Sequence, residues 1–329
     1  MKRVLDIVIR MNNKFLIALV LIIIIGVISG CYPTGDVDEP RTYRYRTGTQ
    51  GLVLNFPADG FTQLYENEDD VRLSIEIKNR GAFPQPEETD DFYGYVWIGG
   101  FDMSILELEP DAGDNRLDPV ALEGKNPVNM EGGKDAFVFV GDTYDLPGGV
   151  PSYRTPIIVT ATYLYKTVAT PTVCVDPHPR STEVREKVCR ISEYGSIALA
   201  GSQGAPVAIT SIEEDVTSNY LLFRIYVQNV GNGLVIPIGG IQEDPNLGYD
   251  WDELNKVEVG YVSVGNVPMD DCRPDDFIKL ENNRGYMLCR VNINNLGTTT
   301  YKAPLNVELE YGYSSSVRKD IEIIKEVLY

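Results

Sequence analysis

The sequence predicts an all-β protein, with two tandem immunoglobulin-like β-sandwich domains after an N-terminal hydrophobic signal or anchor segment. Three observations support this prediction. The 329-residue chain has a charge-free apolar run near its start, alternating strand patterns from Gly51 onward, and a second half that repeats the first. Beyond the apolar run, no amphipathic pattern is long enough for more than about three helical turns.

The first 31 residues have the order of a secretory signal. Four basic residues precede an uncharged apolar run from Phe15 to Ile28, and these are Lys2, Arg3, Arg10 and Lys14. A basic start, an apolar middle and small residues at the end are typical of an exported chain. A membrane-spanning helix needs about 20 apolar residues, so the run is at the short end for an anchor. Both interpretations place the rest of the chain outside the cytoplasm.

The end of this run, Ile28-Ser29-Gly30-Cys31, resembles the lipobox of secreted lipoproteins. The resemblance implies that Cys31 is lipidated and becomes the mature N-terminus. An uncleaved anchor helix and an unmodified buried cysteine are the alternatives. We therefore expect an extracytoplasmic protein anchored to the cell membrane, with residues 32–50 as a polar spacer. The spacer contains the alternating sequence TYRYR at residues 42–46, which could add a strand to the open sheet edge of a neighbouring module.

The rest of the chain divides into two similar parts. Short runs rich in Val, Ile, Tyr and Phe alternate with Gly, Pro, Asn and Asp, which indicates strands and turns. Matching segments occur in the same order in both halves: GLVLNF with PVAITSI, VRLSIEIKNRG with LLFRIYVQNVG, YGYVWIGGF with EVGYVSVGNV, and TPIIVTATYLY with APLNVELEYGY. We predict one sandwich over residues 51–192, a linker over 193–205 and a second sandwich over 206–329.

Each half has a strand that ends in Asn-x-Gly, at Asn79 to Gly81 and Asn229 to Gly231. Asn can bond its own backbone and Gly accepts a positive φ, so the motif ends a strand. The strand followed by NVGN resembles the CARDB-type and related Ig-like modules of archaeal and bacterial surface lipoproteins. This resemblance implies the fold class and leaves the function open.

Five cysteines separate into Cys31 and an even set of four. In an oxidising compartment we expect two disulfides, Cys174–Cys189 and Cys272–Cys289, each closing a short loop. A four-cysteine zinc site is the alternative, but neither pair has the C-x2-4-C spacing of such sites.

The chain is strongly acidic. Removing residues 1–31 leaves 25 basic and 47 acidic side chains, a net charge of −22. This charge argues against nucleic acid as a partner. Carboxylates at Asp111, Asp114 and Asp118 are candidate Ca²⁺ ligands, but no Ca²⁺-loop motif is present and a solvated acidic rim is the preferred explanation. No other metal or cofactor is predicted.

Catalytic motifs are not found, so the sequence predicts a protein that is not an enzyme. The single histidine, His178, has no accompanying nucleophile motif. We expect a structural or adhesive surface protein whose loops and sheet edges bind a surface protein. A lipoprotein that binds a ligand or carbohydrate is the alternative, and a glycoside-active enzyme is a third hypothesis.

Overall fold

The computed structural model describes residues 45–178, 187–191, 196–199, 202–269 and 271–325. This part of the chain consists of strands and four short 3-10 helices, with no α-helix among the described residues, and its sheets pack as sandwiches. The predicted all-β sandwich class is therefore confirmed. The strands are β1 Leu52–Asn55, β2 Gln63–Tyr65, β3 Val71–Asn79, β4 Gly94–Gly99, β5 Leu106–Pro110, β6 Lys134–Thr143, β7 Ser152–Ala169, β8 Thr172–Val175, β9 Ser196–Ala198, β10 Val207–Val216, β11 Tyr220–Asn229, β12 Leu234–Ile236, β13 Lys256–Val264, β14 Val267–Pro268, β15 Asp271–Arg273, β16 Phe277–Lys279, β17 Arg284–Asn292 and β18 Tyr301–Ile324. The 3-10 helices cover Pro86–Glu88, Ile238–Gln242, Pro245–Leu247 and Ile293–Asn295.

The hydrophobic segment 1–31, including Cys31, and residues 32–44 of the spacer lie outside the described residues. The predictions made for them stay predictions. Across the described ranges, we find no helix with the length and apolar character required to cross a bilayer.

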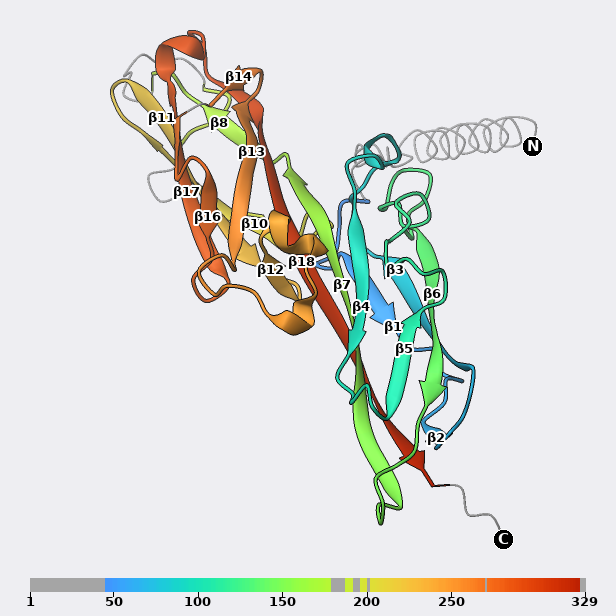
Figure 1. Cartoon of the computed structure of the whole chain (residues 1–329). Helices are drawn as coiled ribbons and strands as arrows, with labels where there is room; N and C mark the ends of the chain where they lie inside the picture. Colours follow the sequence, from blue (N-terminus) through green and yellow to red (C-terminus); the bar gives the residue numbers. More distant parts are fainter. Residues whose placement is uncertain (1–44, 179–186, 192–195, 200–201, 270, 326–329) are drawn as a thin grey trace, which may run out of the picture. The chain divides into compact units, whose positions relative to one another are not determined.

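Two long strands, β7 and β18, form the centre of the largest sheet. They pair antiparallel without a break from Ser152 opposite Ile324 to Ala169 opposite Val307, and they run side by side in Figure 1. β4 pairs with the other edge of β7, and β13 pairs with the other edge of β18. Strands from the first and second halves of the chain therefore share one continuous sheet.

Two smaller sheets repeat one strand order. The first has the order β1-β3-β6-β5, and the second has the order β10-β11-β17-β15 with β9 added on the outer edge of β10. The four strand matches predicted from the sequence occupy equivalent places: β1 and β10, β3 and β11, β4 and β13, β7 and β18. Alternate residues of β3 and β11 are buried, as a strand with one face on a core requires.

Buried tyrosines join the central sheet to both smaller sheets. The Tyr163 hydroxyl on β7 accepts a hydrogen bond from the Leu52 backbone N–H at 3.0 Å. The Tyr311 hydroxyl on β18 accepts one from the Val207 backbone N–H at 3.2 Å. Both tyrosine side chains are fully buried. Because Leu52 and Val207 begin equivalent strands, the repeat extends to individual hydrogen bonds.

The Asn-x-Gly motif forms part of the same repeated network. The Asn79 side-chain oxygen accepts a hydrogen bond from the Gly81 N–H at 3.0 Å and from the Tyr165 hydroxyl at 3.3 Å. The Asn229 side-chain oxygen likewise accepts one from the Tyr313 hydroxyl at 3.1 Å. The asparagine therefore closes the strand end locally, as the sequence predicts, and also fixes the strand end to the central sheet.

The two halves are related by an approximate two-fold axis through the β7–β18 ladder. Tyr163 lies opposite Tyr313, and Tyr165 lies opposite Tyr311. Leu164 lies opposite Gly312, its own counterpart in the repeat. Each half therefore contributes the same long strand to the junction, in the manner of an isologous interface between two subunits.

The described residues belong to one compact unit. Buried apolar residues of both halves, from Leu52 to Ile323, belong to a single core cluster. The segment predicted as a linker, residues 193–205, contains β9, which pairs with β10. The predicted domain boundaries stay a prediction, but the two halves share a sheet and a core.

Both predicted disulfides are present in the structure. Cys174 bonds Cys189, and Cys272 bonds Cys289. The second disulfide crosses between paired strands, since Cys272 of β15 lies opposite Cys289 of β17. This bond therefore holds an edge strand to its sheet.

We expect folding stability to fall at alkaline pH. Burial raises the pKa of Tyr313 to about 12, and burial likewise raises the pKa of Tyr163, Tyr165 and Tyr311. A tyrosine in the unfolded chain has a pKa of about 10. The folded state therefore holds protons that the unfolded state releases, so stability is complete below about pH 10 and decreases as the pH rises through about 12.

Denaturant unfolding measured at intervals from pH 8 to 11.5 checks this expectation. Tyr313→Phe should lower stability at pH 8 but give a shallower decline with pH than the wild type. If the free energy of unfolding declined equally steeply with pH in the two proteins, Tyr313 would not be a source of the alkaline loss of stability.

Candidate functional site: the open edge of β1

Among the described strands, β1 is the edge strand of its sheet, because it pairs with β3 and with no other described strand. The Gly51 carbonyl accepts a hydrogen bond from Arg80 N–H of the β3 side, whereas the Leu52 N–H turns away from β3 to Tyr163. Alternate residues of an antiparallel strand direct their backbone groups toward the partner or away from it. The N–H and C=O of Leu54 therefore point away from β3. Among the described residues, no hydrogen bond to them is found from another segment.

The equivalent edge in the second half is covered. Ile209 N–H donates to the Gln203 side-chain oxygen at 2.9 Å, and the Gln203 side-chain amide donates to the Ile209 carbonyl at 3.2 Å. Leu199 N–H donates to the Thr210 carbonyl at 3.1 Å. β9 then pairs with residues 211–213. Residues 196–199 and the Gln203 side chain thus lie along the edge of β10 and satisfy its backbone groups.

The repeat makes the two edges directly comparable. Leu52 and Val207 are equivalent because each donates its N–H to the equivalent tyrosine. Leu54 and Ile209 follow two residues later and are equivalent in turn. One half therefore supplies a covering strand, and in the other half the described residues leave the same edge open. An open edge is a template for pairing with another strand.

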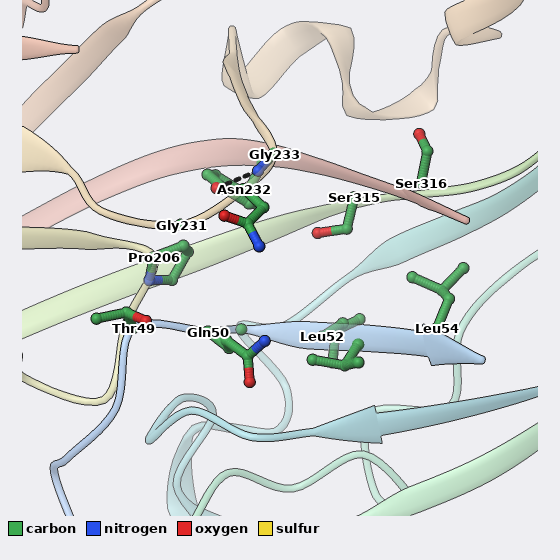
Figure 2. Close-up of a pocket in the computed structure, with 13 residues that line it drawn as sticks. Thr49, Gln50, Leu52, Leu54, Pro206, Gly231, Asn232, Gly233, Ser315 and Ser316 are labelled. Atoms are coloured by element: carbon green, nitrogen blue, oxygen red, sulfur yellow. Dashed lines mark hydrogen bonds between the residues drawn. The ribbon is translucent and has the colours of Figure 1, made fainter. Parts of the chain in front are cut away.

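A groove lies along this open edge, which we name the β1 groove. One side is residues 49–54, and the facing side is the loop from Gly231 to Gly233 with Pro206. Tyr313, Ser315 and Ser316 of β18 also line it. Figure 2 shows Asn232 and the β1 residues on facing sides of the groove. Its volume is about 150 Å³.

A second, larger cavity adjoins the β1 groove. It has a volume of about 620 Å³ and shares Asn232, Gly233 and Ser316 with the groove. Its other walls are the loop that contains Pro245 to Leu254 and the neighbouring residues of β7, β12 and β18. Hydroxyl and amide side chains dominate its polar lining, namely Thr160, Ser314, Ser316, Asn232 and Asn246.

The site carries no charge of its own. None of the residues that line the β1 groove is acidic or basic. Tyr313 is neutral at physiological pH, as an ordinary tyrosine is, and burial raises its pKa further, to about 12. Binding here would depend on backbone hydrogen bonds, neutral side chains and contact area. A charged ligand would have no counter-ion in the lining.

The predicted calcium ligands are not gathered into a metal site. The Asp114 carboxylate accepts a hydrogen bond from the Arg116 N–H at 3.0 Å, and the Asp118 carboxylate accepts one from the Val120 N–H at 2.8 Å. Within the described ranges, no group of three or more His, Cys, Asp or Glu side chains is placed to hold a metal ion. The structure therefore does not support the calcium candidates at Asp111, Asp114 and Asp118. At least two of these carboxylates form local loop turns instead.

His178 lies near the first disulfide. The backbone N–H of His178 donates to the Asp176 carboxylate at 3.1 Å, and Lys187 Nζ contacts the same carboxylate at 2.6 Å. Burial opposes ionisation of Asp176, but hydrogen bonds from Lys187, His178 and Thr300 lower its pKa below the ordinary value. The buried ion pair between Asp176 and Lys187 therefore explains these residues as structural parts of the loop that the Cys174–Cys189 disulfide closes.

No family model matches the chain, and no curated protein matches it. Among solved structures, the Escherichia coli chaperone DraB is 9% identical, with a TM-score of 0.20 over 79% of this chain and 87% of that chain. The C-terminal domain of the Streptococcus pyogenes antigen I/II-family protein AspA is 10% identical, with a TM-score of 0.18 over 84% of this chain and 100% of that chain. At these values the similarity identifies no family.

Sequence reasoning did not find the open edge. It expected binding by loops and sheet edges in general and did not single out Leu54 or Gln203. The sequence held part of the information needed to find the open edge. The repeat aligns GLVLNF with PVAITSI, and the residues that precede these two segments differ. Which of the two edges is covered depends on the path of the preceding chain, and that path is a tertiary property.

Proposed function

We propose that the protein is a membrane-tethered, extracytoplasmic surface protein with a structural or adhesive role, and that it binds a protein partner along the β1 groove. One observation carries the proposal: of two equivalent sheet edges, the described residues cover one and leave the other open beside a groove. Main-chain pairing at a free edge is a general mode of polypeptide recognition. The signal-like start and the disulfides support an extracytoplasmic location.

Carbohydrate binding is the second candidate function, and the larger cavity favours it. Its lining combines hydroxyl and amide side chains without a charged group. Such a lining suits a neutral, polyhydroxylated ligand, and the exposed Trp251 lies in the adjoining loop sequence. The β1 groove favours protein binding more strongly because its unpaired groups are backbone groups.

Photo-crosslinking in cells that carry the full chain tests both functions. A benzophenone amino acid replaces exposed Asn232 in the groove or, as a matched control, exposed Asn219 at the other end of β11. We expect a protease-sensitive adduct from position 232 and none from position 219. An adduct resistant to protease but sensitive to glycosidases would favour carbohydrate binding. Absence of any adduct at 232, or retention of the protein in the cytoplasm, would contradict the proposed function.

A further inference from the structure

The repeat also indicates what covers the open edge. We propose that residues 41–44 of a second copy of this chain add as a strand to β1, so that copies join head to tail on the membrane. This inference rests on the proposed function and names its partner. It follows from the path of the covering segment in the second half, from the path of the chain before β1, and from charge.

The covering segment in the second half identifies its counterpart. Val207 lies 155 residues after its equivalent, Leu52. Subtracting this offset from β9, Ser196–Ala198, gives residues 41–43, with the sequence Arg-Thr-Tyr. The first half therefore has a segment at the position that supplies the covering strand in the second. Residues 43–46 alternate Tyr and Arg, which in an extended strand gives two different faces.

The described residues before β1 do not cover its edge by the route that β9 uses in the second half. A tight reversal before β1 would bring Tyr45 beside Leu54. Instead, the Thr47 carbonyl accepts a hydrogen bond from Lys125 Nζ, and the Gly48 carbonyl accepts one from Ser202. Tyr45 itself is 8% exposed and does not line the β1 groove. The described residues 45–48 therefore leave the open edge of β1 uncovered.

The length of chain before Tyr45 permits exchange between neighbours. If Cys31 is the membrane attachment, residues 32–44 separate it from the described unit. At about 3.3 Å per residue, this segment spans up to about 40 Å. That reach allows a strand close to Tyr45 to contact an adjacent copy while its start stays at the same membrane surface.

Charge favours the same occupant. Residues 41–44 contain two arginines and no acidic residue, whereas residues 45–329 contain 23 basic and 44 acidic side chains. The charge of the donated segment is therefore opposite to the net charge of the unit that accepts it. The groove lining is uncharged and does not oppose the approach. An exchange of this kind is heterologous, so it extends into chains of copies unless it closes into a ring.

A cysteine crosslink between two copies tests the inference. β10 has a bulge between Ile209 and Ser211 that β1 lacks, so Ser211 corresponds to Asn55. Ser211 pairs with Ala198, and Ala198 corresponds to position 43. Positions 55 and 43 should therefore face each other across the exchanged strand. Full-length protein with Asn55→Cys is mixed in detergent with full-length protein with Tyr43→Cys and oxidised mildly. We expect a disulfide-linked heterodimer at least five-fold more abundant than with the control Asn294→Cys, at another exposed site.

Two further variants keep the test decisive. Asn232→Trp, at an exposed position in the groove, should reduce the heterodimer at least five-fold while leaving the circular dichroism spectrum unchanged. A chain that carries both Asn55→Cys and Tyr43→Cys should form a ladder of oligomers. An intramolecular disulfide in that chain, or equal crosslinking to Asn294→Cys, would overturn the inference.

The two proposals can fail separately. If the adducts at position 232 contain a different protein and no heterodimer forms, strand exchange is wrong and the adhesive function stands. If position 232 gives no adduct and no heterodimer forms, both are wrong.

Discussion

Gly81→Ala is expected to destabilise the protein by about 4 kcal/mol, the size reached when a clash and a broken buried network combine. A Cβ at this position would lie 2.6 Å from the Gly204 carbonyl oxygen and 2.7 Å from the Gln50 carbonyl oxygen. It would also overlap the Tyr165 hydroxyl. Two of these neighbours are backbone atoms, so the clash cannot be relieved by rotating a side chain.

The loss extends beyond the clash. Displacing Tyr165 would break its hydrogen bond to Asn79, which is fully buried. A buried acceptor left without a partner costs about 1 to 3 kcal/mol. Urea or guanidinium unfolding of the variant measures the total effect.

Two other glycines supply the controls for this experiment. A Cβ added at Gly148 would have no heavy atom within 4 Å, so Gly148→Ala should stay within about 0.5 kcal/mol of the wild type. Gly231 is the repeat counterpart of Gly81, and its Cβ would meet Tyr313 and the Pro206 side chain. Gly231→Ala should fall between the other two, because these neighbours are side chains. A Gly81→Ala protein as stable as Gly148→Ala would show that the motif does not fix the strand end.

Removal of the Cys272–Cys289 disulfide has the second largest expected effect. The bond closes a loop with a sequence separation of 17. In the chain-entropy model, a loop of this size contributes about 3 kcal/mol through restriction of the unfolded chain. The double variant Cys272→Ala, Cys289→Ala should therefore lose about 3 kcal/mol in denaturant unfolding.

The consequence should be local as well as global. Cys272 belongs to β15, which among the described strands pairs only with β17, so loss of the bond frees an edge strand. Hydrogen exchange in residues 271–273 should accelerate more than in β7. The double variant of Cys174 and Cys189 is the matched comparison, because its sequence separation of 15 is similar but its bond lies outside the β15–β17 pair. Unchanged exchange in β15 would contradict the role given to the bond.

Much of the fold could be predicted from the sequence, because alternation and turn residues are local signals. VRLSIEIKN and YLLFRIYVQN became β3 and β11, and the Asn-x-Gly that ends each could be recognised from the chemistry of those side chains. Cysteine parity and short spacing were enough to predict both disulfides. These features depend on neighbours in the sequence.

The site could not be predicted in the same way. Whether Leu54 has a backbone partner depends on where residues 45–48 go, and the contacts of Lys125 and Ser202 with this segment decide that path. The shared ladder was also missed. The sequence showed that TPIIVTATYLY and APLNVELEYGY match, but not that these two copies pair with each other. A sequence match shows that two strands hold equivalent places in the repeat. Whether those two strands pair with each other depends on the folded chain.

The meeting of Leu164 with its own counterpart, Gly312, limits how this chain can be divided. Separating the halves by proteolysis or by recombinant expression would remove from each long central strand the partner that pairs along its full length. The unpaired strand edge could then pair with the same strand of another copy. Either half produced alone should therefore form homodimers or insoluble aggregates. The molecule is best regarded as a pair of equivalent halves that need each other's long strand to complete one sheet.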